Sequence, residues 1–148
     1  MPSSNQKKIE DIIIALIQTQ SPFTTPATAP VLNYDADGDT VSSRSRVVVR
    51  ASEPVPIVPG FKPDSPAPVL QSDVEISIRL ATSSSSTLDT WEAAVDAALA
   101  TAPAAVITAA LASYPNGFKF DDVAAGSRQP EGAENRERTK TVRVVIGV

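Results

Sequence analysis

The chain has 148 residues, which suits a single domain, and its 13 basic and 17 acidic side chains give a net charge of -4. A net negative charge provides no general attraction to nucleic acid. The sequence contains no cysteine and no histidine, which excludes disulfides, thiolate nucleophiles, the usual zinc ligands and the commonest general base.

The N-terminal segment, residues 1–20, is predicted to be an amphipathic helix. Ser3 followed by Gln6 fits a capping box at its start. Glu10 and Asp11 interrupt an apolar run of only about ten residues, too short to span a bilayer, and no small-residue cleavage site of the secretory kind follows. We therefore expect a chain made and kept in the cytoplasm, or in something assembled there, without a membrane partner. Five residues have the spacing of one apolar helix face: Ile9, Ile12, Ile13, Leu16 and Ile17.

A connector and two strands are predicted to follow the first helix. The connector is predicted to be extended, because Pro22, Pro26 and Pro30 prevent the helix from continuing. Residues 31–34 form a candidate short strand. An acidic turn at 35–39, with glycine at its fourth place, leads into an alternating strand over 44–51.

A long, stiff loop is predicted over residues 54–68, where six prolines fall in fifteen residues. This density prevents ladder pairing and favours polyproline-like extension. Long loops inside compact domains are uncommon unless they have a function, so the segment is a candidate contact with another subunit or partner. A surface loop stiffened against fraying explains the prolines equally well.

The most regular part of the sequence is a strand that leads into a capped helix. Residues 73–80 alternate strictly between apolar and polar side chains, which predicts one buried and one wet side. After a serine-rich turn, the run from Thr87 to Glu92 supplies a hydroxyl N-cap and early acidic residues. This helix is predicted to place Trp91 in the core and to end near Pro103.

A shorter helix over residues 104–112 is predicted next, packed inward through Val106, Ile107, Ala110 and Leu111. A turn at 114–117 stops it, and residues 118–120 form a short strand. Residues 125–137 are predicted to be a long loop and residues 138–148 the final strand. The sequence thus predicts an α+β single domain over 1–148, a two-layer α/β sandwich whose mostly antiparallel sheet has about four strands, with two or three helices packed on one face.

The outward positions of the long predicted strands are rich in arginine. They carry Arg44, Arg46, Arg50, Glu75, Arg79 and Arg143, with Lys140 or Thr141 at the margins. Opposite charges on neighbouring strands contribute roughly 0.2–1 kcal/mol a pair. A solvated face is therefore the default interpretation, and an oligomer-facing or DNA-facing surface is the alternative.

Acidic and hydroxyl groups do not form a recognisable catalytic pattern. Asp35, Asp37 and Asp39 alternate like calcium ligands, but Thr40 and Arg46 stand where an EF-hand needs Gly and Glu. The adjacent carboxylates at 121–122 point to opposite faces of a strand. The serines at 83–86 lack a histidine base and a P-loop. We expect no enzyme activity, no cofactor and no metal site.

The order of elements resembles the tail terminator, or tail completion, proteins of long-tailed phages. The resemblance covers most of the chain and is carried by the helix at 9–20 and the segments 46–51, 73–82, 91–99 and 138–144. It implies a small α/β sandwich that forms a homo-oligomeric ring, expected to be a hexamer, on top of the tail tube. Such a ring stops tube growth and joins the tail to the neck or connector protein. It implies no catalytic residues, and a place in the virion after assembly in the host cytoplasm.

The contacts with ring neighbours and partners are expected in the two long loops and on the arginine-rich face. DNA would pass through the ring without specific binding, which suits the lean acidic charge. The candidate contact residues are Pro54, Pro56, Ile57, Pro59, Phe61, Pro63, Arg46, Arg50, Arg79, Arg128 and Arg136.

Three alternatives remain open from the sequence. The first keeps the virion but makes the chain a head-completion or connector protein of the neck. A metal-assisted hydrolase built on Asp35, Asp37, Asp39 and Asp121 is the second. The third is a non-viral binding domain that stays monomeric.

Overall fold

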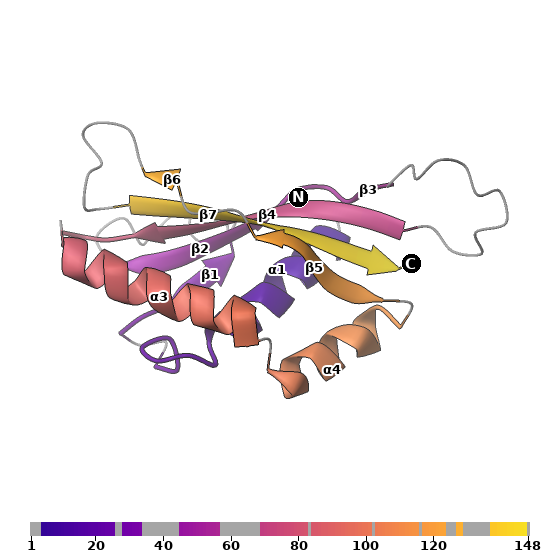
Figure 1. The fold of residues 1–148 in the computed structure, drawn as a ribbon, viewed down its shortest axis with the longest axis horizontal. Coiled ribbons are helices and arrows are strands. Elements are labelled where there is room, and N and C mark those ends of the chain that lie inside the picture. Colours follow the sequence, from indigo (N-terminus) through magenta and orange to yellow (C-terminus); the bar gives the residue numbers. More distant parts are fainter. Residues whose placement is uncertain are drawn as a thin grey trace, which may run out of the picture.

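The fold is an α+β two-layer sandwich, as the sequence predicts (Figure 1). The computed structural model describes residues 4–25, 28–33, 45–56, 69–82, 84–101, 103–115, 117–123, 127–128 and 137–147. Within these ranges the chain forms three helices and a seven-stranded, mostly antiparallel sheet. The helices lie on one face of the sheet, and the other face carries no helix from the described ranges (Figure 1).

The sheet has the strand order β1-β2-β4-β7-β5, and two short strands extend it, β3 beside β4 and β6 beside β7. The β1–β2 pair is parallel and the other pairs are antiparallel. The strands are β1 (Val31–Asn33), β2 (Arg46–Ala51), β3 (Val55–Pro56), β4 (Val69–Arg79), β5 (Phe118–Val123), β6 (Ser127–Arg128) and β7 (Glu137–Gly147).

The centre of the sheet is the β4–β7 pair, in register from Val69↔Gly147 to Arg79↔Glu137. The predicted strand at 73–80 begins four residues earlier, because β7 continues far enough to pair the segment from Val69 onward. The final strand is shifted by one residue from the predicted 138–148, and β1 and β2 lie inside the predicted strands.

The two predicted loops each contain a short strand. Pro56 pairs with Leu70 on β4, although the proline density predicts no ladder pairing. Proline is tolerated here because β3 is a two-residue strand at the sheet edge. Ser127 and Arg128 pair with β7 as β6. Residues 57–68, 125–126 and 129–136 of the predicted loops lie outside the described residues, and Glu137 is the first residue of β7.

The helices are α1 (Ser4–Ile17), α3 (Ser85–Thr101) and α4 (Ala104–Ser113). Helix α1 ends at residue 17 rather than 20, because Thr19 and Gln20 donate their amides to the carbonyls three residues earlier. Such i→i+3 bonds are typical of a tightened last turn. The predicted capping residue Ser3 lies outside the described residues.

Helix α3 begins at Ser85, so its N-cap is not the predicted Thr87 but a residue nearer the N-terminus. The Ser84 hydroxyl accepts the amide of Thr87 at 3.2 Å and is therefore the N-cap. The break before Pro103 bends α4 by 66° from α3.

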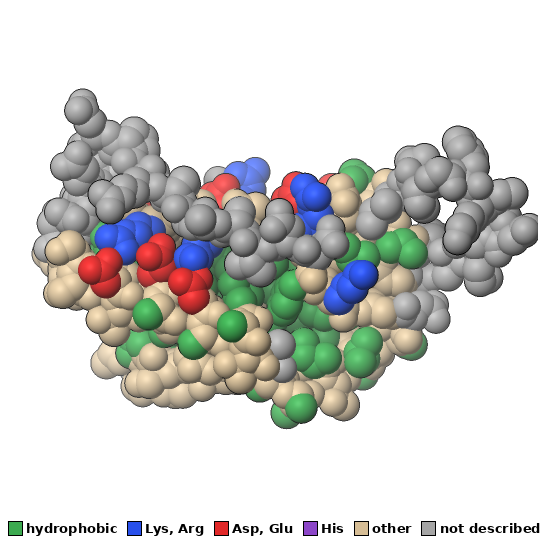
Figure 2. Space-filling view, viewed as in Figure 1, with side chains coloured by type: hydrophobic (Ala, Val, Ile, Leu, Met, Phe, Trp, Pro, Cys, Tyr) green, Lys and Arg blue, Asp and Glu red, His purple; other side chains and the backbone are tan. Residues whose placement is uncertain are grey.

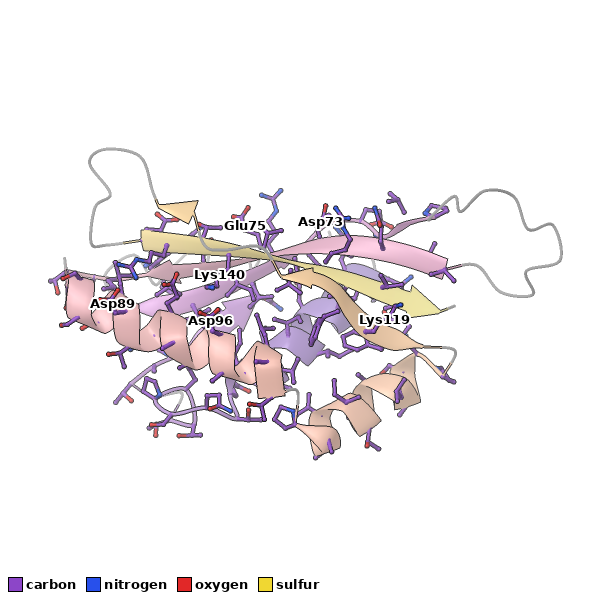
Figure 3. All side chains as sticks on the ribbon, in the orientation of Figure 1. Asp73, Glu75, Asp89, Asp96, Lys119 and Lys140 are labelled. Atoms are coloured by element: carbon purple, nitrogen blue, oxygen red, sulfur yellow. The ribbon has the colours of Figure 1, made fainter. Side chains whose placement is uncertain are left out.

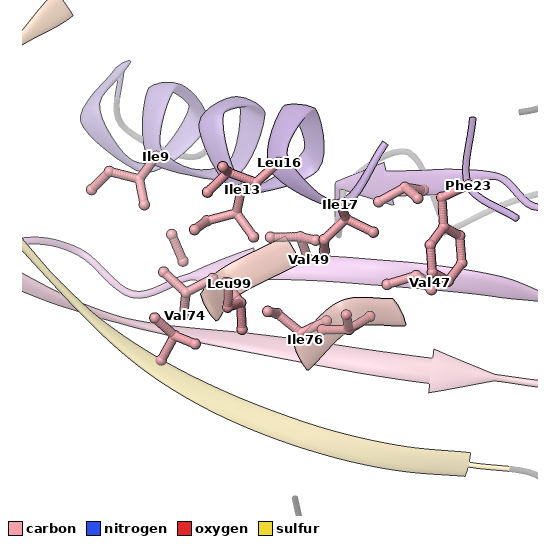
Figure 4. Close-up of a cluster of buried hydrophobic side chains, with 14 of the residues drawn as sticks. Ile9, Ile13, Leu16, Ile17, Phe23, Val47, Val49, Val74, Ile76 and Leu99 are labelled. Atoms are coloured by element: carbon pink, nitrogen blue, oxygen red, sulfur yellow. The ribbon is translucent and has the colours of Figure 1, made fainter. Parts of the chain in front are cut away.

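The core lies between the helices and the inner face of the sheet (Figure 4). The alternation of β2 and β4 places Val47, Val49, Val74 and Ile76 on this face, where they are fully buried. Burying a side chain of this size contributes roughly 1.5–3 kcal/mol. Helix α1 covers them with its predicted apolar face, through Ile9, Ile13, Leu16 and Ile17.

Candidate interaction surfaces

The sheet brings three of the predicted contact residues together. Arg46 and Arg79 are direct cross-strand neighbours, and Arg50 lies opposite Glu75, all on the face away from the helices. Pro54 and Pro56 lie apart from them, at β3. Arg128 belongs to β6, but its side chain is not described; Ile57, Pro59, Phe61, Pro63 and Arg136 lie outside the described residues.

The outer face of the sheet is a ladder of mixed charge. The Arg79 Nε lies 3.6 Å from the Glu137 carboxylate, and the Arg143 Nε donates to Asp73 at 3.2 Å. Such half-exposed pairs contribute about 0–1 kcal/mol each. The arginines here therefore do not form a basic patch of one sign. The predicted solvated face is only partly so, because Val48, Ser77 and Val145 on it are buried.

A second set of charges lies on the inner face and joins α3 to β7. Asp89, Glu92 and Asp96 follow one side of α3, and Arg138 and Lys140 stand opposite them (Figure 3). Arg138 Nη1 lies 2.5 Å from Asp89 and 3.3 Å from Glu92, and Lys140 pairs with Asp96. The hydrogen bond that Arg138 donates to the Asp89 carboxylate raises the pKa of Arg138 above its ordinary value, although burial opposes this. We call this set the α3–β7 latch.

The latch corrects the prediction that Lys140 lies on the outward face. Lys140 pairs with Ile76 in the β4–β7 register and is buried. Its position has the same parity as Val142 and Val144, so alternation places it on the inner face. The signal was present in the sequence, together with the i, i+3, i+7 spacing of the acidic residues on α3.

A buried polar clamp joins α1 to the end of β2. Ala51 extends beyond the last residue that β1 pairs, and α1 supplies the missing partners. The Glu10 carboxylate accepts the Ala51 amide at 2.9 Å, and the Gln6 side-chain amide donates to the Ala51 carbonyl at 3.3 Å. Glu10 is buried within this clamp. Its position inside an apolar run is the only sequence signal of the role.

Helix α4 presents an uncharged, partly exposed surface. Only Ala110 is fully buried, and Leu111 is 40% exposed, which corrects the prediction that it packs inward. No charged residue occurs between Asp96 and Lys119. A hydrogen bond joins the end of this helix to α1: the Tyr114 hydroxyl donates to Asn5 Oδ1 at 3.0 Å. Burial raises the pKa of Tyr114.

Charged and apolar side chains occupy different parts of the helical side of the molecule. Figure 2 shows charged side chains gathered over α3 and the start of β7, and hydrophobic side chains around α4 and β5. Among the described residues, the exposed large apolar side chains are Val55, Val69 and Leu111. Exposed apolar surface of this kind marks candidate protein contacts when it is contiguous.

An open pocket of about 320 Å³ lies where the connector after α1 meets the first turns of α3. Its lining consists of neutral side chains: Ser21, Pro22, Ser86, Thr87, Thr90 and Trp91. The Phe23 ring packs edge-on against Trp91. The two ring centroids are 5.1 Å apart and the interplanar angle is 76°. Trp91 is a core residue, as predicted, and also forms part of the pocket wall.

Within the described ranges, no group of three or more acidic, histidine or cysteine residues could hold a metal ion. The acidic turn Asp35, Asp37 and Asp39 and the side chain of Asp121 lie outside them. In the same ranges no single helix is long and apolar enough to cross a membrane, although α3 and α4 together meet the length and composition requirements as a bent pair.

Comparison with known proteins finds no family model that matches this sequence and no curated protein that is similar to it.

Proposed function

We propose that this chain is a structural protein of a tailed-phage virion, a tail terminator that forms a homo-oligomeric ring at the top of the tail tube. The ring stops tube growth and joins the tail to the neck. The order of elements along the chain supports the proposal, and so does the two-layer α+β fold with helices on one sheet face.

The observation that carries the proposal is the exposed surface of α4. This helix has no charged residue, and its Leu111 is 40% exposed, whereas among the described residues most other large apolar side chains, apart from Val55 and Val69, are at least partly buried in or against one core. An exposed uncharged helix loses apolar contact with water when it associates with another protein surface. A ring subunit needs such a surface for its neighbour.

The charges of the described residues suit a ring around DNA. Among the outer-face arginines, Arg79 and Arg143 have carboxylates beside them, and the net charge of the chain is -4. Few phosphate contacts give weak, salt-sensitive affinity, so DNA can move through such a ring without being held. Arg46, Arg50 and Arg79 stay predicted contacts with the tube or the neck.

Tail tubes from the same virus provide the test. The purified protein is added to tubes, and the mixture is imaged by negative-stain microscopy and compared with tubes alone. The proposal predicts a cap at one end of each tube and shorter tubes when the protein is present during tube polymerisation. Bare tubes of unchanged length would contradict it.

A further inference from the structure

We infer that neighbouring copies join head to tail, with Leu111 on α4 of one copy inserted into the pocket beside Trp91 of the next copy. The inference rests on the proposed function, because it requires that copies of the chain associate. It specifies which two surfaces meet and that they differ from each other.

The inserted group is Leu111. The outer side of α4 carries small side chains at Ala104, Ala105, Ala109 and Ala112, all exposed. Leu111 therefore projects beyond its neighbours on this helix. The helix is held in place by buried Ala110 and by the hydrogen bond from Tyr114 to Asn5, so the projection is part of a fixed surface.

The receiving site is the neutral pocket at the start of α3. Pro22 and Trp91 supply apolar surface, and the threonine hydroxyls on its rim already have partners within the chain. Thr90 donates to the Ser86 carbonyl at 2.9 Å, and the Thr87 hydroxyl accepts from Ser84 at 2.9 Å. Because these polar groups are satisfied and no charge lines the pocket, an apolar side chain suits it better than a polar or ionic ligand.

A second copy must supply the leucine. From Thr90 to Thr101, α3 rises by about 16 Å, at roughly 1.5 Å per residue, and α4 continues beyond its end (Figure 1). Leu111 therefore cannot reach the pocket of its own chain. The two surfaces are also matched in charge, since both are neutral and neither has to desolvate an ion. A contact between two different surfaces of identical subunits closes into a ring when the rotation between them is a fraction of a full turn.

The test uses one variant of each surface. Leu111→Lys replaces the apolar side chain with a charged one, which is costly to bury in a neutral pocket, and Thr90→Arg fills the pocket. Both positions are exposed on helices, where these residues are well tolerated. Ser86→Arg, on the same rim, is the second pocket variant if Thr90→Arg unfolds. Asp11→Lys, on α1, is the control, because Asp11 is exposed and belongs neither to α4 nor to the pocket lining. Circular dichroism and thermal unfolding show whether each variant is folded.

Sedimentation velocity is measured for each protein alone and for an equal mixture of the two surface variants. We expect each surface variant to associate roughly 30-fold more weakly or worse, the loss typical of a central anchoring side chain, and the control to match the natural protein. The mixture should form a dimer and nothing larger. The Thr90→Arg variant supplies the intact leucine and the Leu111→Lys variant supplies the intact pocket, and the other two surfaces of the pair are blocked.

Three results would overturn the inference. Surface variants that assemble like the natural protein, a mixture that stays monomeric, and a surface variant that forms dimers by itself each contradict a head-to-tail contact. In these cases rings of the natural protein would leave the proposed function standing. Rings that respond to the variants as expected but leave tail tubes uncapped would instead contradict the proposed function alone. A natural protein that stays monomeric would contradict both.

Discussion

Glu10 shows how a single buried polar residue can determine where a helix docks. It interrupts the apolar face of α1, yet it is only 5% exposed and accepts the amide of Ala51. An amide in this position would otherwise lie buried at the end of a strand without β1 beside it. An unsatisfied buried donor costs about 1–3 kcal/mol, so Glu10 fixes the position of α1 on the sheet.

Replacing this carboxylate tests that role. Glu10→Leu removes the acceptor, and we expect the free energy of unfolding to fall by about 1–3 kcal/mol in urea titration. Glu10→Gln keeps an acceptor oxygen and should lose less. Asp11→Asn, at the exposed neighbouring position, is the control and should change stability by less than about 0.5 kcal/mol. Equal losses for Glu10→Leu and Asp11→Asn would show that the clamp has no structural role.

The two sets of ion pairs should differ in their effect on stability. Asp96→Asn leaves Lys140, which is 7% exposed, without its carboxylate. We expect a loss of about 1–2 kcal/mol, below the 3–5 kcal/mol of a fully buried pair, because the Asp96 side chain is 47% exposed. Asp73→Asn breaks the exposed pair with Arg143 and should cost less than about 0.5 kcal/mol.

A double variant separates the charge from the packing. Adding Lys140→Met to Asp96→Asn removes the buried charge that the single variant leaves behind, so part of the lost stability should return. Thermal unfolding of the four proteins in this cycle measures the coupling. A double variant that is less stable than Asp96→Asn would show that Lys140 stabilises the fold through contacts other than this pair.

At the scale of elements, the start of α3 depends on one hydroxyl. Ser84→Ala removes the N-cap and should cost about 1 kcal/mol, which lowers the melting temperature by roughly 2–4 °C for a chain of this size. Ser85→Ala, one residue later and exposed, is the matched control and should leave the melting temperature nearly unchanged. Similar shifts for the two variants would argue against Ser84 as the cap.

Periodicity predicted the elements whose pattern is local. The apolar stripe of α1 and the alternation of β2, β4 and β7 identify both the element and its buried face, because each pattern reports a face that packs against the core. The same patterns place Arg46, Arg50 and Arg79 on one sheet face. Their role as partner contacts stays a prediction.

Features that depend on a distant partner were not predicted. The first four residues of β4 pair because β7 extends beside them, and Pro56 pairs because β4 presents a free edge. The pocket joins Ser21 and Pro22 to residues about 65 positions further along the chain, as the lining shows. Leu111 fits an inward-facing helical spacing, but the bend at Pro103 turns α4 so that this side chain is exposed. No local pattern contains these relations.

At the scale of the molecule, the charged latch and the neutral α4 lie over different parts of the helical layer (Figure 2). The head-to-tail contact uses the neutral surfaces alone. Ionic screening should therefore leave it unchanged, and we expect equal association constants from about 0.1 M to about 1 M sodium chloride. Sedimentation velocity across this range measures the effect. A tenfold or greater fall of the association constant with salt would indicate that the contact is made instead by the charged outer face of the sheet.

The central claim is that copies of this chain assemble into a closed ring, and imaging the purified protein alone tests it most directly. Negative-stain particles should be rings of one size with a central opening as wide as the bore of the tail tube, and mass measurement should give a single whole-number multiple of the 15.5 kDa chain. A uniform population of 15.5 kDa monomers at every concentration would contradict the claim.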